Sequence, residues 1–186
     1  DFTLPTDGYE SPWAMAQLVF EYDSARLAAP PRNLTALKDW ILANPGRFTF
    51  AQPPDYLGVT FLKQALYGLI ADPALLQSPV DDASYADLTA PLWAFLGEIE
   101  PALWRGGAAY PQNEAALGQL LADGEIDISF AFNPGRASAE IAAGNLPDTV
   151  RTFVLQGGTI GNASFVAIPF NAAHRAGAMV IANLIL

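Results

Sequence analysis

Aromatic rings with acidic neighbours lie at the ends of the predicted strands and helices, where they would suit the binding of a positively charged solute. An aromatic face attracts a cation with about 0.5–2 kcal/mol per contact, and a nearby carboxylate adds to that attraction. Packing in a local core explains any one of these rings better than binding does, whereas their shared placement favours a site. The residues concerned are Tyr9, Glu10, Trp13, Tyr56, Tyr110 and Phe132.

A second candidate for binding is the segment 55–60, which joins a predicted strand to a predicted helix. The N–H groups of a helix start and the hydroxyl of Thr60 would hold a polar group there. Capping of the helix by Asp55 explains the same residues equally well. The sequence therefore leaves both interpretations open.

Residues for nucleophilic or metal chemistry are scarce. The single histidine, His174, stands beside Arg175, and the chain has no cysteine and no G-x-S-x-G motif. These residues assemble neither a catalytic triad nor a zinc site. The glycine-rich segment 157–161 joins two predicted strands, without the following helix that a phosphate-binding loop requires. We expect no catalytic residue, no metal and no cofactor.

Carboxylates keep one enzymatic alternative open, a hydrolase that uses two acids across a cleft. Nothing in the sequence places any two of them on opposite sides of a cleft, so solvated positions are the simpler explanation. The candidates are Glu10, Glu21, Glu98 and Glu100.

The composition indicates a folded, acidic protein with a large core. Hydrophobic residues make up 52% of the 186 residues and charged residues only 15%, which excludes a disordered chain. The 19 acidic residues outnumber the 9 Lys and Arg, and the net charge of -10 leaves no basic face for nucleic acid. The same charge mildly favours cationic solutes.

Both ends of the sequence suggest a piece of a longer chain. It starts at Asp1 without Met, and it ends at 178–186 on an apolar helical pattern without a helix stop. The uncharged run 152–173 contains Gly, Asn and Pro, which suits sheet and turn better than a membrane span. We expect residues 1–186 to form a single lobe, which would self-associate through its exposed cleft and hinge when isolated.

The elements that would position these residues alternate between strands and helices, which predicts an α/β fold. Residues 14–22 suit a buried strand, Asn33 the cap of a helix, and residues 47–51 the next strand. This spacing predicts a βαβ unit with a parallel strand pair. We expect three layers, with a mixed, mostly parallel sheet flanked by helices. The other expected elements are a helix capped at Asp55, a long helix from Ser84, a helix from 113 to 124, a strand at 126–132, a short helix to Gly144, strands at 150–155 and 163–168, and a last helix from 172.

The order of these motifs resembles the extracytoplasmic solute-binding proteins of ABC importers, which have the type II periplasmic binding protein fold. The strand within 13–23 ends on an acidic residue, and the Pro30-Pro31 pair follows it ahead of a helix. The resemblance covers almost the whole chain and is nearest to the second lobe of the cluster that holds thiamine-binding proteins. The later segments that keep the family's order are Pro53-Pro54-Asp55 with Gly58, residues 113–129, and residues 165–169.

The resemblance implies a periplasmic protein that binds a small solute between two lobes and delivers it to ABC permease subunits in the membrane. In the thiamine binders aromatic rings clamp the heterocycles, and by position these rings fall at 110–113 and at Phe132, which lacks the tyrosine hydroxyl. Iron ligation, as in related ferric-ion binders, is disfavoured because this chain has no Tyr-Tyr pair. The predicted ligand-binding residues are Glu10, Trp13, Asp55, Tyr56, Thr60, Tyr110, Asn113, Phe132 and Asn133.

The charge of the solute remains open between two classes. A thiamine-like heteroaromatic solute or an amine would use the rings and the acids. An anionic or oxyanion solute would instead use helix N-termini and the Asn side chains. The acidic composition favours the cation.

Overall fold

A computed structural model describes residues 5–185 of the chain, which divides into two compact units. Unit 1 combines the chain up to Gln17 with the chain from Gly161 onward, and unit 2 spans Leu18–Ile160. The backbone therefore passes between the units twice, once on each side of unit 2.

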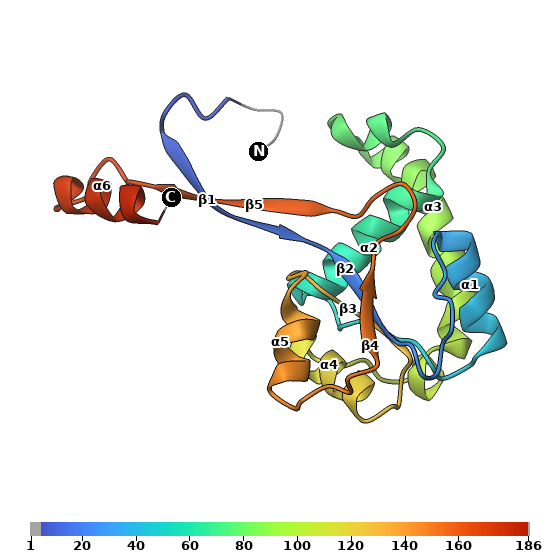
Figure 1. Ribbon diagram of the computed structural model, residues 1–186. Helices are drawn as coiled ribbons and strands as arrows, with labels where there is room; N and C mark the ends of the chain where they lie inside the picture. The colour runs from blue at the N-terminus through green and yellow to red at the C-terminus, as the bar shows by residue number, and fades with distance from the viewer. Residues whose placement is uncertain (1–4, 186) are drawn as a thin grey trace. The chain divides into compact units, whose positions relative to one another are not determined.

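Unit 1 is an open ribbon with one helix. Strand β1 (Glu10–Gln17) pairs antiparallel with β5 (Gly161–Ala167), and α6 (Arg175–Leu184) follows β5 (Figure 1). No residue that the structure describes in this unit is buried. Its exposed large apolar side chains are Tyr9, Trp13, Met15, Phe170, Met179, Val180, Ile181, Leu184 and Ile185.

The strand expected at 14–22 is in fact two strands. The first, β1, is exposed or half-exposed along its length, whereas β2 (Val19–Asp23) is buried in unit 2. Apolar residues continue through both strands, so the sequence pattern did not reveal where the chain enters the second unit.

Unit 2 is built on a small mixed sheet in which β2 lies between β3 (Ile128–Ala131) and β4 (Val150–Phe153). Strand β2 runs antiparallel to both neighbours. Phe48 forms a parallel bridge with Ile128 of β3. The segment at Phe48, β3 and β4 therefore share one direction, and β2 alone runs against them.

The predicted α/β class is confirmed, but the expected parallel pair between the first two strands is wrong. Residues 47–51 do not pair with β2; they approach β3, and only through Phe48. An alternation of strands and helices predicts that a helix connects two parallel strands. It does not show whether those two strands are neighbours or have another strand between them. Here β2 is inserted between β3 and β4, which α5 connects.

Helices lie in two groups around this sheet. Helices α1, α2 and α3 pack on one another, while α4 packs on β3 and α5 on β4. In Figure 1, α1 and α3 lie to one side of β4, and α4 and α5 lie to the other. The helices are α1 (Leu34–Ala43), α2 (Tyr56–Leu69), α3 (Asp82–Ile99), α4 (Glu114–Ala122) and α5 (Arg136–Ala142), with 3-10 turns at Pro73–Gln77, Glu100–Ala102 and Trp104–Gly107.

Three helix starts are capped as the sequence predicts. The side chains of Asn33, Asp55 and Asn113 accept hydrogen bonds from the first turns of α1, α2 and α4. Helix α3 starts earlier than expected, because the carboxylate of Asp81 caps it by accepting the N–H of Ser84 at 2.8 Å.

The two faces of the sheet differ in chemistry. Phe20 and Phe130 are paired across β2 and β3, and their rings join the buried rings of Phe48 and Phe61 on the side of α2. Successive residues of a strand point to opposite faces, so Glu21 lies on the other face, toward α4 and α5. That carboxylate is fully buried.

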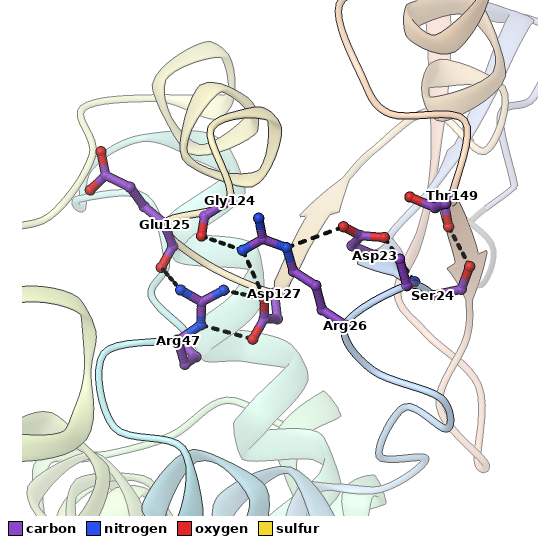
Figure 2. A network of polar contacts seen from close by, with 9 residues as sticks. Asp23, Ser24, Arg26, Arg47, Gly124, Glu125, Asp127 and Thr149 are labelled. Atoms are coloured by element: carbon purple, nitrogen blue, oxygen red, sulfur yellow. Dashed lines mark hydrogen bonds and ion pairs between the residues drawn. The ribbon is translucent and has the colours of Figure 1, made fainter.

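A polar network fixes the edge at which β2 ends and β3 begins (Figure 2). Arg47 donates from Nε to Asp127 at 2.8 Å, and a second pair between the same side chains completes a bidentate contact. Arg26 donates to the carbonyl of Gly124 at 2.6 Å and pairs with Asp23, the acid that closes the strand. The network thus lies at one edge of the sheet, and β3 ends at the opposite edge.

Candidate functional site

Three turns meet at the edge of unit 2 where β3 ends, namely the turns that precede α2, α4 and α5. The N–H of Gln52 donates to the carbonyl of Pro111 at 2.8 Å, which joins the first turn to the second. The ring of Tyr56 stacks on that of Phe132, which joins the first turn to the third. We call this junction the candidate surface.

The candidate surface carries a stacked ring pair, in which Tyr56 is exposed and Phe132 is half-buried. The centroids of Tyr56 and Phe132 lie 4.8 Å apart with an interplanar angle of 28°. Tyr56 remains 57% exposed although Phe132 covers part of it. An aromatic surface held in place by a second ring is ready to stack on a solute or to face a cation.

Asp55 and Thr60, the polar residues predicted at the start of α2, both make hydrogen bonds to the backbone of that helix. Asp55 Oδ1 accepts from the N–H groups of Leu57 at 3.0 Å and Gly58 at 3.4 Å. The hydroxyl of Thr60 is buried and donates to the carbonyl of Tyr56 at 2.8 Å. Asp55 therefore presents one remaining carboxylate oxygen at the surface, while Thr60 serves the helix itself.

The two predicted asparagines shape the other turns. Asn113 Oδ1 accepts from the N–H of Ala116 at 3.0 Å and caps α4. Asn133 Oδ1 accepts from the N–H of Gly135 at 2.9 Å. Each keeps its amide NH₂ group for other partners, since only the oxygen is used in these bonds.

Tyr110 turns away from the candidate surface. Its ring packs against Phe50, with centroids 5.1 Å apart, and its hydroxyl donates to Glu100 at 3.4 Å. Burial and the neighbouring Glu100 raise the pKa of this phenol. Together with Trp93 these residues line a separate pocket of about 270 Å³.

Glu10 and Trp13 belong to unit 1. Glu10 lies opposite Ala167 in the ribbon, and Trp13 sits at the bulge between Pro12 and Ala14, where its side chain is 54% exposed. The structure thus brings together Asp55, Tyr56 and Phe132 with Asn113, which caps α4, and Asn133, which lies in the turn before α5, all within unit 2.

Two charged residues that the sequence analysis missed complete the candidate surface. Arg136, at the start of α5, donates from Nη1 to the buried Glu21 at 2.7 Å. Its Nε lies 3.5 Å from Glu114 Oε1, at the start of α4. The guanidinium also occupies the space beside Gly118, where an added Cβ would lie 2.1 Å from Nη2. A buried glutamate within an apolar strand is the one sequence signal that predicts such an arginine.

The electrostatics of this group favour an extra positive charge. Burial raises the pKa of Glu114, Arg136 lowers it, and the nearby Asp55 raises it further. Burial also raises the pKa of Glu21, against the lowering effect of Arg136. Two carboxylates, Glu21 and Glu114, thus share a single guanidinium, and a cation near Asp55 and Glu114 would relieve the repulsion between those two acids.

Other chemistry finds no support among the residues that the structure describes. Within residues 5–185, no group of three or more acidic or histidine side chains is arranged to hold a metal ion. His174 lies just before α6 in unit 1, with no side-chain hydrogen bond to that helix. Over the same residues, no helix has the length and apolar character needed to span a bilayer.

Comparisons with known proteins give a consistent assignment. The whole chain, residues 1–186, matches the family model of the bacterial extracellular solute-binding proteins. It is 44% identical over 186 residues to protein YnjB of Escherichia coli strain K12, covering 100% of this chain and 48% of that protein.

Solved structures share the fold at low sequence identity. A periplasmic thiamin binding protein matches with a TM-score of 0.61 and 14% identity, over 95% of this chain and 48% of its own. AfuA from Actinobacillus pleuropneumoniae, bound to exogenous fructose-6-phosphate, matches with a TM-score of 0.58 and 16% identity, over 96% and 49%. The chain thus spans about half the length of the proteins it matches. It belongs to the family of bacterial extracellular solute-binding proteins.

Proposed function

We propose that this chain supplies one half of the solute site of an extracytoplasmic binding protein for an ABC importer, and that the solute is a small cation such as a thiamine-like heteroaromatic or an amine. The observation that carries the proposal is the stacked pair of Tyr56 and Phe132 beside the acids Asp55 and Glu114. Rings supply the stacking surface and carboxylates supply the charge.

The second half of the cleft would come from the rest of a two-lobed protein. Two observations support this view: the chain spans about half of its relatives, and the backbone leaves unit 2 through paired strands on either side. Closure of such a clamp would bury the solute against the candidate surface before delivery to the permease subunits. The chain would bind and release, with no residue in a catalytic role.

The exposed apolar side chains of unit 1 support a further part of the proposal. An isolated chain would leave the side chains of β1 and α6 in water, where such surfaces promote association. We therefore propose that the isolated chain self-associates, through the surfaces that the rest of a two-lobed protein would cover.

An anionic solute is the second candidate, because α2 and α4 both start at the candidate surface and Arg136 lies beside them. Helix starts and an arginine are the usual means of holding an oxyanion. Against this, Asp55 and Asn113 already accept from N–H groups of both first turns, and Arg136 is engaged with two glutamates. An anion would therefore have to rely on the amide NH₂ groups of Asn113 and Asn133, which carry no charge.

Replacing Tyr56 with alanine is expected to weaken solute binding by about tenfold or more, because the change removes half of the stacking surface. The measurement is isothermal titration of the intact protein with thiamine, its phosphates, putrescine and spermidine. Tyr85→Ala is the matched control, since Tyr85 on α3 is 55% exposed and Tyr56 is 57% exposed.

The two variants separate the possible outcomes. Binding of a cation that is lost in Tyr56→Ala and kept in Tyr85→Ala supports the proposal. Binding that survives equally in both variants would place the solute elsewhere. Binding of phosphate or sulfate alone, with no heat from any cation, would establish the anionic alternative.

A further inference from the structure

We propose that Glu114 sets the charge preference of the site: its carboxylate makes the candidate surface select cations, and its neutralisation shifts the preference toward anions. This inference rests on the proposed function and adds the residue that decides the class of solute. It follows from the way in which Glu21 and Glu114 share the guanidinium of Arg136.

Arg136 is held between one acid that solvent cannot reach and one that it can. Glu21 is fully buried, and its Oε2 accepts from Arg136 at 2.7 Å. Glu114 is partly exposed, with its side chain 39% accessible, and its Oε1 lies 3.5 Å from Arg136 Nε. A solute on the candidate surface can reach Glu114 but not Glu21.

The position of the guanidinium is set by Gly118 and the buried Glu21 rather than by Glu114. Gly118 leaves the space that the guanidinium fills, because any Cβ there would collide with Nη2. The bond to Glu21 is the shorter of the two contacts, and it lies in the interior, where water competes least. Removing the charge of Glu114 would therefore leave Arg136 in place, with its exposed edge free of an anionic partner.

The other acid of the surface is less suited to this role. One carboxylate oxygen of Asp55 already accepts hydrogen bonds from two N–H groups of α2, so the helix start partly stabilises its negative charge. Glu114 has only the longer contact with Arg136 and lies close enough to Asp55 for the two charges to repel. A bound cation would therefore stabilise the carboxylate of Glu114 more than that of Asp55.

The test compares Glu114→Gln, Glu114→Asp and Asp39→Asn in the intact protein. Asp39 is the control because it is an exposed acid on α1, a helix that packs on α2 and α3, and because it lies outside the cavity that Glu114 and Arg136 line. Each protein is titrated with thiamine, putrescine and inorganic phosphate. We expect the ratio of cation affinity to phosphate affinity to fall about tenfold or more in Glu114→Gln, equivalent to about 1.4 kcal/mol. The ratio should be kept in Glu114→Asp and unchanged in Asp39→Asn.

The outcomes distinguish this inference from the proposed function. A wild-type protein that binds a cation, with an unchanged ratio in Glu114→Gln, would overturn the role of Glu114 and leave the proposed function intact. An equal fall in Glu114→Gln and Asp39→Asn would show a general effect of net charge and would also overturn the role. A wild-type protein that binds phosphate and no cation would overturn the proposed function, and this inference with it.

Discussion

Replacing Gly58 with alanine is expected to destabilise unit 2 by roughly 1–3 kcal/mol and to abolish solute binding. A Cβ at this position would lie 2.0 Å from the backbone carbonyl oxygen of Ala51, so the start of α2 would have to move away from the preceding turn. Tyr56 lies in the same first turn of the helix and would move with it. The stacked contact with Phe132 would then be lost.

Gly97→Ala in α3 is the matched control, because Gly97 is helical and exposed and has no atom within 4 Å of an added Cβ. Alanine is a better helix former than glycine by about 0.8–1.0 kcal/mol, so this variant should be neutral or slightly more stable. The measurements are urea unfolding and solute titration of both variants. A Gly58→Ala protein with wild-type stability and affinity would show that the close approach of α2 to Ala51 does not position the site.

Replacing Arg136 with methionine is expected to cost about 3–5 kcal/mol of unfolding free energy at neutral pH, because it leaves the buried Glu21 without its cationic partner. Burial already raises the pKa of Glu21, and the loss of Arg136 removes the main influence that lowers it. A carboxyl whose pKa is higher in the folded state is most compatible with folding when protonated. The destabilisation should therefore grow as the pH rises through the folded pKa and shrink as the pH falls.

The measurement is urea unfolding of Arg136→Met between about pH 5 and pH 8. The double variant Glu21→Leu, Arg136→Met is the control, because replacing a buried ion pair with apolar side chains of similar volume is often neutral. We expect it to recover most of the lost stability and to lose the added pH dependence. A single variant that costs no more than about 0.5 kcal/mol, the usual effect of a surface substitution, would contradict a buried pair.

The helix starts were predictable because their signals are local. Asn33, Asp55 and Asn113 each cap the helix that follows them, and a cap needs only its own first turn. Ring positions were partly predictable for the same reason: Tyr56 follows the segment at Phe48 and Phe132 follows β3, and these run in the same direction and end at one edge of the sheet. Tyr110 also follows the pattern of an exposed ring, yet its side chain packs on Phe50, which only the tertiary structure decides.

The missed features depend on pairs of residues far apart in the chain. Glu21 and Arg136 are separated by 115 positions, and neither alone indicates an ion pair. The insertion of β2 between β3 and β4 is likewise a choice of neighbours that a one-dimensional pattern does not contain. The entry of the chain into unit 2 near Leu18 lies within one apolar run, so composition gave no signal of that boundary.

Hydrogen–deuterium exchange of the intact protein, with and without a bound solute, tests most directly whether the solute lies on the candidate surface. We expect slower exchange in the turns 52–58, 110–116 and 132–138 when the solute is present, because these turns meet at the Tyr56–Phe132 pair. Protection confined to other segments, such as those around Gln64 and 156–158, would contradict it.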